Sequence, residues 1–504
     1  MVTTIWKEPS VRSAPPSRLR SLTVLTAVLL PALALSGTSA GATPDGHGHK
    51  PVRLSGASPF AGCAPGALDG KMADGAIEPQ LAADPGNPRR IAAVWPQDRQ
   101  RGVVQAITRD GGTSWKRTVV PHLTRCSGGR DDYVDEPAVT FTADGALLVT
   151  GGLAMADGSA SSGLSTRSDD GGRTWTRPAV IIEETDPARG GVASGPAVAD
   201  PRDPDVLYVV TPRFPAAERT RNDAWISRST DGGRSWQPPT LVVDAGDRQL
   251  VSGHRLTVLD DGTLVDVHTL VRFGEGPITG RLTLQAVRST DSGRTWSAPV
   301  KVADLRTRFL FQDPESGEQV SHTTSLLSDT AVDRRTGRIQ VAWQDSRFTD
   351  GAVDSVAMAA SDDGGRTWST PVKVNRTPTG VPLPNQQAFT VALAVGDDGT
   401  VAVSHSDFRQ NDTGEALLTD RWLVRCRPGP ADCTSEAATW RETRLTPTSY
   451  DMRRAPRIPD EASPRGYFLG ERMGLVATGR GFTAAWAVPD ADALGRAAVH
   501  GSTS

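Results

Sequence analysis

Short apolar stretches recur through most of the chain, and tight turns separate them. From residue 78 onward a typical unit is an apolar run, an Asp-Gly or Asp-Pro turn and a second apolar run, as in EPAVTFTADGALLVT and HRLTVLDDGTLVDV. A third run such as LTLQAVRSTDSG and a shorter fourth such as APVKV follow. Alternating apolar runs joined by Gly, Pro and Asp turns predict antiparallel strands. We therefore predict an all-β chain.

One octapeptide recurs five times, at the turn between the third and fourth runs. It reads TRDGGTSW, SDDGGRTW, STDGGRSW, STDSGRTW and SDDGGRTW, ending at Trp115, Trp175, Trp236, Trp296 and Trp368. The intervals are 60, 61, 60 and 72 residues, and CTSEAATW, which ends another 72 residues on at Trp440, reads as a decayed sixth copy. Four antiparallel strands in about 60 residues are typical of a β-propeller blade.

The chemistry of the octapeptide suits a hairpin turn. Its Asp carboxylate can accept backbone N–H bonds within the turn, and its Gly residues allow positive φ. The Trp is expected to fold back against the adjoining sheet. We therefore assign a structural role to five aspartates: Asp110, Asp170, Asp231, Asp291 and Asp363.

Counting the units favours seven blades. Six four-strand units lie between Glu78 and Leu445, while residues 474–488 predict another inner pair of strands and residues 495–501 a third strand. The segment near Val52–Ser55 would supply the outer strand of this last blade, closing the ring by joining the two ends. A ring of six blades is the alternative.

The start of the chain has the pattern of a secretory signal peptide. Two Arg residues precede an apolar run from Leu22 to Leu35, and small residues follow. The run is too short to span a bilayer core about 30 Å thick. We expect residues 1–40 to be a cleaved signal peptide, residues 41–62 a linker and ring-closing segment, and residues 63–504 a single propeller domain outside the cell.

The charge balance bears on partners. The 55 Lys and Arg residues nearly match the 58 Asp and Glu residues, for a net charge of −3. Such a balance gives no electrostatic footprint for nucleic acid or for an anionic membrane surface. No later segment is apolar enough to span a membrane, and we expect a monomer.

The four cysteines are expected to form disulfides, because exported proteins enter oxidising compartments. Cys426 and Cys433 enclose a short polar loop and are expected to pair, which leaves Cys63 for Cys126. No Cys-x-x-Cys spacing occurs, and the His-rich tract within residues 41–62 is interpreted as solvated linker. We predict no metal and no cofactor.

The octapeptide Ser-x-Asp-x-Gly-x-Thr-Trp resembles the Asp box (BNR repeat) of the sialidase, or neuraminidase, superfamily, over about residues 77 to 490. The resemblance implies an Asp-box propeller with the boxes on the face opposite the active site. It also implies glycan cleavage, although Asp boxes occur in non-catalytic propellers as well. Sialidases have six blades, so a count of seven is a departure from the family.

Charged residues gather just before the first strand and just after the second strand of several blades, on the face opposite the boxes. Glycoside hydrolysis needs two carboxyl groups, and the resemblance implies a Tyr nucleophile paired with a Glu, an Asp acid/base and three Arg that hold a substrate carboxylate. The catalytic candidates are Asp98, Glu78, Glu136, Tyr467 and Glu471, with Tyr467 as nucleophile beside Glu471 or Glu136 and Asp98 as acid/base. The substrate-binding candidates are Arg99, His254, Asp345, Arg347, Asp407 and Arg409.

One departure concerns the substrate. Sialidases begin the first blade with Arg-Ile-Pro, whose Arg belongs to the carboxylate-binding set, whereas this chain has Ile77-Glu78-Pro79. A Glu there would repel sialic acid, so a different glycan is equally compatible with the sequence.

Two functions follow from these patterns. The first is a secreted, sialidase-like glycoside hydrolase that acts on an extracellular glycan at the mouth of the central channel. The alternative is a non-catalytic propeller that binds glycan or protein on the same face. The two differ in whether two carboxylates and a Tyr lie close together at the channel mouth.

Overall fold

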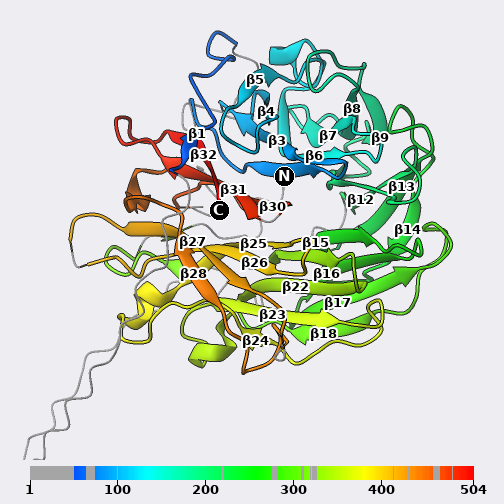
Figure 1. The fold of residues 1–504 in the computed structure, drawn as a ribbon. Coiled ribbons are helices and arrows are strands. Elements are labelled where there is room, and N and C mark those ends of the chain that lie inside the picture. The colour runs from blue at the N-terminus through cyan, green and yellow to red at the C-terminus, as the bar shows by residue number, and fades with distance from the viewer. Residues whose placement is uncertain are drawn as a thin grey trace, which may run out of the picture.

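Seven antiparallel sheets of four or five strands form a propeller (Figure 1). The computed structural model describes residues 50–504 except 64–73, 99, 217–220, 275–280, 308–310, 318, 321–325, 413, 430–431, 458–465 and 480. The predicted seven-bladed all-β fold is confirmed, and the six-bladed alternative is wrong. The predicted signal peptide lies outside the described residues. Among the described residues, no helix has the length and apolar character needed to cross a membrane.

The first three blades follow the chain order. Blade 1 contains β2 (Gln80–Asp84), β3 (Asn87–Gln97), β4 (Gly102–Thr108) and β5 (Lys116–Val119). Blade 2 contains β6 (Tyr133–Phe141), β7 (Leu147–Ala154), β8 (Ser161–Ser168) and β9 (Ala179–Glu184). Blade 3 contains β11 (Ala197–Ala199), β12 (Leu207–Phe214), β13 (Asp223–Ser229) and β14 (Thr240–Val243), with β10 (Gly191–Val192) also paired to β12.

The next three blades repeat this arrangement. Blade 4 contains β15 (Gln249–Val258), β16 (Leu264–Arg272), β17 (Arg281–Ser289) and β18 (Val300–Asp304). Blade 5 contains β21 (Ser328–Asp333), β22 (Arg338–Asp345), β23 (Ser355–Ser361) and β24 (Val372–Lys373). Blade 6 contains β25 (Ala388–Val395), β26 (Val401–Asp407), β27 (Leu418–Cys426) and β28 (Arg441–Arg444), with β29 (Tyr450–Asp451) also paired to β27.

Short elements lie in the connections between the main strands. β19 (Phe311–Gln312) and β20 (Gln319–Val320) form a small hairpin. Among the described residues, four 3-10 turns are present: η1 (Arg125–Ser127), η3 (Ser346–Thr349), η4 (Leu383–Gln386) and η5 (Met452–Arg454).

Blade 7 joins the two ends of the described chain. Its strands are β30 (Gly474–Thr478), β31 (Gly481–Pro489), β32 (Ala497–Thr503) and β1 (Val52–Arg53). Val52 lies opposite Gly501 in the antiparallel pairing of β1 with β32. The expected ring closure by the segment near Val52–Ser55 is therefore present.

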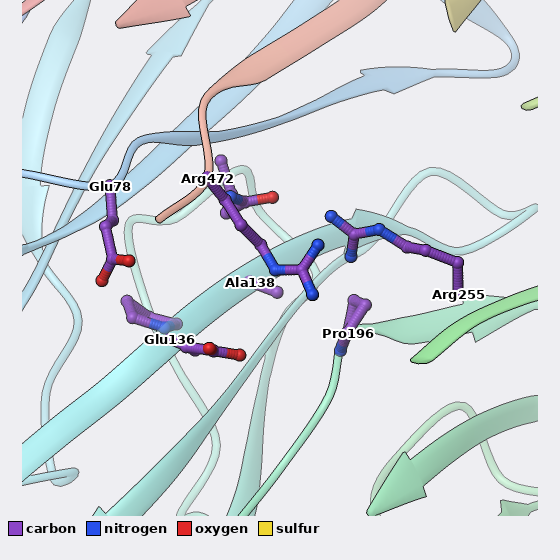
Figure 2. Close-up of a pocket in the computed structure, with 8 residues that line it drawn as sticks. Glu78, Glu136, Ala138, Pro196, Arg255 and Arg472 are labelled. Carbon is purple, nitrogen blue, oxygen red and sulfur yellow. The ribbon is translucent and has the colours of Figure 1, made fainter. Parts of the chain in front are cut away.

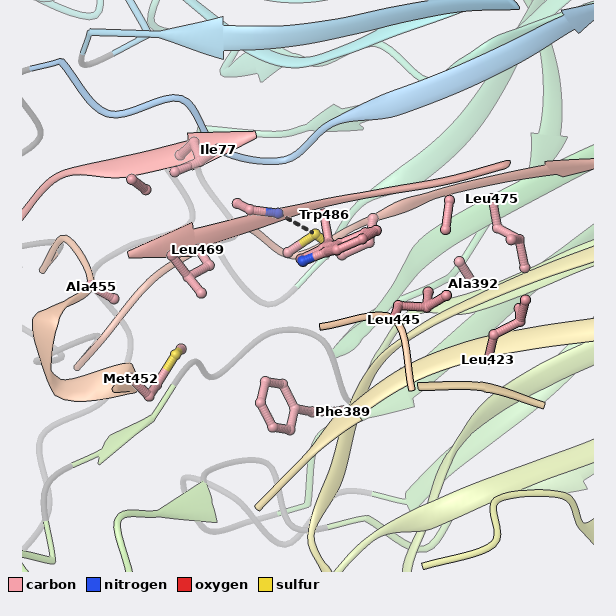
Figure 3. Close-up of a cluster of buried hydrophobic side chains, with 14 of the residues drawn as sticks. Ile77, Phe389, Ala392, Leu423, Leu445, Met452, Ala455, Leu469, Leu475 and Trp486 are labelled. Atoms are coloured by element: carbon pink, nitrogen blue, oxygen red, sulfur yellow. Dashed lines mark hydrogen bonds between the residues drawn. The ribbon is translucent and has the colours of Figure 1, made fainter. Parts of the chain in front are cut away.

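Seven hydrophobic clusters hold the ring together, each built from two neighbouring blades. The cluster between blades 6 and 7 includes Phe389 and Leu423 from one blade and Leu475 and Trp486 from the other (Figure 3). Trp486 is only 1% exposed. Since burial of apolar surface is the main favourable term in folding, these interfaces make the ring one cooperative core.

Each octapeptide forms the expected turn. The Oδ1 atom of Asp231 accepts the backbone N–H groups of Arg234 at 3.0 Å and Ser235 at 2.9 Å. Equivalent pairs of bonds reach Asp110, Asp170, Asp291 and Asp363. The carboxylate therefore satisfies donors that the turn itself leaves without partners.

The same turn also binds the preceding blade. Gly233 has a φ of +82°, and a Cβ placed on it would lie 2.6 Å from a methyl carbon of Leu148 in blade 2. The indole of Trp236 donates to the hydroxyl of Ser165 in the same blade at 2.8 Å. The second Gly of the box is thus required by close approach as well as by backbone conformation.

Both disulfides have the predicted pairing. Cys63 is bonded to Cys126, and Cys426 to Cys433. The second bridge joins Cys426, at the end of β27, to Cys433 in the connection from β27 to β28, where the octapeptide has decayed. A covalent link therefore lies in the connection where blades 1 to 5 use an Asp carboxylate.

Replacing one box carboxylate should lower stability. Asp231→Ala leaves the N–H groups of Arg234 and Ser235 without their acceptor, as in the loss of a helix cap, which costs about 1–2 kcal/mol. Urea titration of the purified protein measures the effect. Asp397→Ala, which removes an exposed carboxylate from another turn, is the matched control and should leave the free energy of unfolding unchanged. Equal stability of the two variants would contradict the assigned role.

The box aspartates should also set the acid limit of stability. Bonds from the Thr295 hydroxyl and backbone N–H lower the pKa of Asp291 to about 2 from 3.8. Because the folded pKa is depressed, this stabilisation is present above pH 3.8 and is lost as the pH falls towards 2. Asp291→Asn should therefore show a shallower fall in melting temperature across this interval than the unchanged protein. Parallel pH profiles would refute this explanation.

Candidate functional site

A pocket lies where the first strands of several blades begin. These strands form the inner edges of the sheets, and three carry a bulge near the same end, between Asp135 and Ala138, Ser252 and Arg255, and Phe389 and Ala392. A bulge re-aims a side chain out of the regular alternation. Glu78 and Glu136 have φ values of 50° and 42°, a conformation that is costly for residues other than Gly and that clusters at functional sites.

The starts of the first strands surround a hollow (Figure 2). Its empty volume is about 300 Å³, including space open to solvent. It is lined by Glu78, Gln80, Glu136, Pro137, Ala138, Pro196, Arg255 and Arg472. The first and third strands of a blade run in the same direction, so the Asp box, which follows the third strand, lies at the opposite end from this pocket.

Glu78 joins the first blade to the last. Glu78 is only 4% exposed. Its Oε1 accepts the backbone N–H of Glu471 at 2.6 Å, and its own backbone N–H donates to the carbonyl oxygen of Leu469. Burial raises the pKa of Glu78 well above its usual value, and the negative charges of Glu471, Asp135 and Glu136 raise it further. The Glu78 carboxyl is therefore held in its protonated form into a higher pH range.

Glu136 has a different electrostatic environment in the same pocket. Burial raises the pKa of Glu136 above its usual value and the Asp135 charge adds to the rise, but the guanidinium groups of Arg472 and Arg255 favour the ionised form and oppose it. Figure 2 shows the Arg472 and Arg255 side chains approaching the pocket from opposite sides. Nε of Arg255 lies 2.9 Å from Oδ1 of Asp329, and burial followed by the charge of Arg472 lowers the pKa of Arg255 to about 10.

Asp98 lies in a hydrogen-bonded loop at the end of β3. Its carboxylate accepts the Ser58 hydroxyl at 3.1 Å and the Asp74 N–H at 3.2 Å, and Arg101 approaches it at 3.4 Å. It is not among the residues that line the pocket. Arg99 lies outside the described residues. An acid/base role for Asp98 stays a prediction.

Tyr467 packs in the core between blades 6 and 7. It is 3% exposed, and Arg457 lies with its guanidinium carbon 4.6 Å from the centre of the ring and donates to its hydroxyl at 2.9 Å. Glu471, four residues later, donates its backbone N–H to the carboxyl group of the pocket residue Glu78. A nucleophilic role for Tyr467 therefore also stays a prediction.

The two predicted Asp-x-Arg pairs after second strands are ion-paired internally. Arg347 lies 2.6 Å from Asp345, whose carboxylate also accepts the indole N–H of Trp343. Arg409 lies 2.7 Å from Asp407 and bonds Glu442. These contacts order the strand ends, and substrate binding by either pair is untested.

His254 lies in the bulge beside Arg255 and contacts Asp266, which also contacts His268. Burial lowers the pKa of His268, so its imidazole is neutral at neutral pH. This is the one group of His, Cys, Asp and Glu in the described part of the chain with donor atoms close enough for a metal ion.

Sequence reasoning missed Arg255 as a pocket residue and assigned no role to Arg472. Arg255 directly follows the predicted His254, but in a regular strand neighbouring side chains point to opposite faces. The bulge changes that register, and no pattern in the sequence specifies it. The sequence did carry a signal for the pocket itself, in the Glu-Pro and Gly-Pro pairs at residues 78–79, 136–137 and 195–196. Within sheets Pro is confined to unpaired strand edges and bulges, so these pairs indicate where first strands begin irregularly.

Comparisons with known proteins agree with the fold. Residues 136–316 match the family model of the BNR repeat-like domain. A sialidase of Bacteroides fragilis is 28% identical over 169 residues, which cover 29% of this chain and 28% of the sialidase. A xyloglucanase of Paenibacillus is 29% identical over 210 residues, covering 41% of this chain and 18% of that protein. Each match therefore spans less than a third of the relative's own length.

Among solved structures, an α-L-arabinanase of Penicillium chrysogenum aligns with a TM-score of 0.47 at 16% identity, covering 71% of this chain and 94% of that one. The five octapeptides, the seven four-stranded sheets and the matched repeat domain lead to one conclusion. The chain is a seven-bladed Asp-box propeller that contains a BNR repeat-like domain at residues 136–316 and is similar in sequence to sialidases.

Proposed function

We propose that this protein is a secreted glycoside hydrolase that cleaves an extracellular glycan at the pocket, with Glu78 as general acid and Glu136 as the second carboxylate. The observation that carries the proposal is a buried carboxyl group, Glu78, and a half-buried one, Glu136, in one pocket with different charged neighbours. Glu78 has three negative neighbours, whereas Glu136 has one, Asp135, and two Arg neighbours that favour its ionised form. Glycosidic cleavage requires one protonated and one ionised carboxyl group, and these neighbours make Glu136 the more readily ionised of the two.

The chemical roles follow from those surroundings. Protonated Glu78 donates its proton to the glycosidic oxygen as the bond from that oxygen to the anomeric carbon breaks. Ionised Glu136 either activates a water molecule or attacks the anomeric carbon itself, and water then completes the hydrolysis. Arg472 and Arg255 stabilise the negative charge of Glu136 and donate N–H groups to sugar oxygens.

Two further observations support glycan as the substrate and the cell exterior as the location. The relatives named as a sialidase and a xyloglucanase share sequence with this chain, although these names refer to different sugars. Two disulfides are typical of proteins in oxidising compartments. We therefore propose a glycan substrate without naming the sugar, and the proposal does not favour sialic acid over other sugars.

The acid can be tested by Glu78→Gln. This change keeps an acceptor for the Glu471 N–H but removes the proton donor, so turnover should fall about 10²–10⁴-fold. A panel of chromogenic glycosides, sialosides included, supplies the assay. Melting temperature at neutral pH should not fall, and Glu436→Gln, at an exposed position, should retain full turnover. A Glu78→Gln variant as active as the unchanged protein would rule out the assignment, and glycan binding without any turnover would favour the non-catalytic propeller.

The pH profile supplies an independent test. Because Glu78 must be protonated to act as an acid, turnover should fall as the pH rises through its elevated pKa. In Glu78→Gln the residual turnover should lose this basic limb. A basic limb that persists unchanged in the variant would assign it to another group.

Tyr467→Phe separates this proposal from the Tyr mechanism implied by the resemblance. If the two Glu residues carry the chemistry, removing a hydroxyl that bonds Arg457 in the core should change turnover less than about 10-fold. Asp98→Asn should behave similarly, since Ser58 and Asp74 can still donate to its amide oxygen. A loss of about 10²–10⁴-fold in either folded variant would instead support the sialidase-type assignment.

A further inference from the structure

A buried cluster of two His and one Asp lies in blade 4, and one of its members is next in sequence to the pocket residue Arg255. Asp266 and His268 are two residues apart on β16, so their side chains point to the same face of the sheet. His254 belongs to β15, where a bulge between Ser252 and Arg255 places it beside them. The side chains of His254, Asp266 and His268 are 7%, 0% and 0% exposed.

The donor atoms of the cluster converge. The Nδ1 atoms of His254 and His268 lie 2.8 Å and 3.0 Å from the same oxygen, Oδ2 of Asp266, and the two imidazole rings have centroids 5.1 Å apart. One donor atom from each of the three residues lies within 4.8 Å of the other two. Donors bound to a cation at about 2.0–2.2 Å are separated by about 3 Å, so small shifts of these side chains would close the set around one ion.

The cluster is not satisfied by protein groups alone. Within the described residues, Nε2 of His254, Nε2 of His268 and Oδ1 of Asp266 are buried and have no hydrogen-bond partner. Buried polar atoms without partners are uncommon and indicate a missing water or ion. Both imidazoles use Nδ1 in the contact with Oδ2, so Oδ1 of Asp266 remains available to the same ion, and each Nε2 remains available to a water molecule.

We propose that His254, Asp266 and His268 bind one divalent transition-metal cation, with Zn²⁺ as the best match. Two imidazoles and a carboxylate are a common donor set for Zn²⁺, whereas Ca²⁺ and Mg²⁺ prefer sites made of oxygen donors. The second oxygen of Asp266 or a water molecule would complete the coordination.

The position of the cluster gives such an ion a positioning role. His254 and Arg255 are adjacent in the bulge, and Arg255 lines the pocket. A cation bound to His254 would fix the bulge and thereby the direction of Arg255. The ion would act by holding Arg255 in place and would not contact the substrate.

Metal binding can be measured without an activity assay. The test uses the chain with His47→Gln and His49→Gln, which removes two other histidines that could bind metal near the N-terminus. After treatment with EDTA and dialysis, titration with ZnCl₂ should show one Zn²⁺ per chain by calorimetry and elemental analysis. Bound Zn²⁺ should raise the melting temperature, because a ligand that binds the folded state stabilises it.

Variants locate the ion. His268→Gln and Asp266→Asn should weaken Zn²⁺ binding by about 100-fold or more, whereas His500→Gln, which changes a histidine of blade 7, should bind like the background chain. The titration of the background chain does not depend on whether any variant folds. Failure of that chain to bind Zn²⁺, Co²⁺ or Ni²⁺ would overturn the proposal and leave a hydrogen-bonded His-Asp-His group, as would full binding by His268→Gln.

Discussion

The contact on which the ring depends is the one between each Asp box and the blade before it. The box carboxylate folds the turn, the second Gly lets the turn approach the neighbouring sheet, and the Trp covers the junction. For Gly233 and Trp236 the neighbour is blade 2, through Leu148 and Ser165. Because each box bonds both within its own turn and across the interface, one local motif orders successive blades.

A closed ring then imposes a constraint on its centre. The first strands have no sheet neighbour on the channel side, so Pro and bulges are tolerated there. Charged side chains at these strand starts are removed from water, and burial raises the pKa of both Glu78 and Glu136. The junction between the last blade and the first adds a further restriction, since a Cβ on Gly470 would lie 2.1 Å from Cγ of Glu78.

The features predictable from the sequence were those encoded locally. The octapeptide fixes a turn by its own hydrogen bonds and so marks the blade repeat, and counting strand units beyond its five copies predicted the seventh blade and the pairing of β1 with β32. The short spacing of Cys426 and Cys433 is also a local signal, and it leaves Cys63 for Cys126. Glu78 and Glu136 could be identified as pocket candidates because each is a charged residue at the predicted start of a first strand.

The remainder of the site depends on contacts between distant segments. The pocket position of Arg255 results from a bulge, and the contact of Glu78 with Glu471 spans 393 positions of the chain. Neither has a local signature. The surroundings of Asp98 likewise depend on Ser58 and Asp74, which precede the first blade, so its sequence position alone could not show that its carboxylate accepts these bonds.

The Asp-x-Arg pairs show why charge at a repeated position is weak evidence for a site. The second strands carry large buried Trp residues, and a buried indole N–H needs an acceptor. The side chain of Gln97 accepts the indole N–H of Trp95 at 3.1 Å, and the carboxylate of Asp345 accepts that of Trp343 at 2.8 Å. In each case the acceptor lies two residues further along the strand. The Arg that follows Asp345 then compensates the buried carboxylate. The polar residue at this position is thus explained by an indole in blades 1 and 5, and in blade 6 Asp407 accepts from Thr377 and Arg409. The strained Glu78 and Glu136 instead line the pocket.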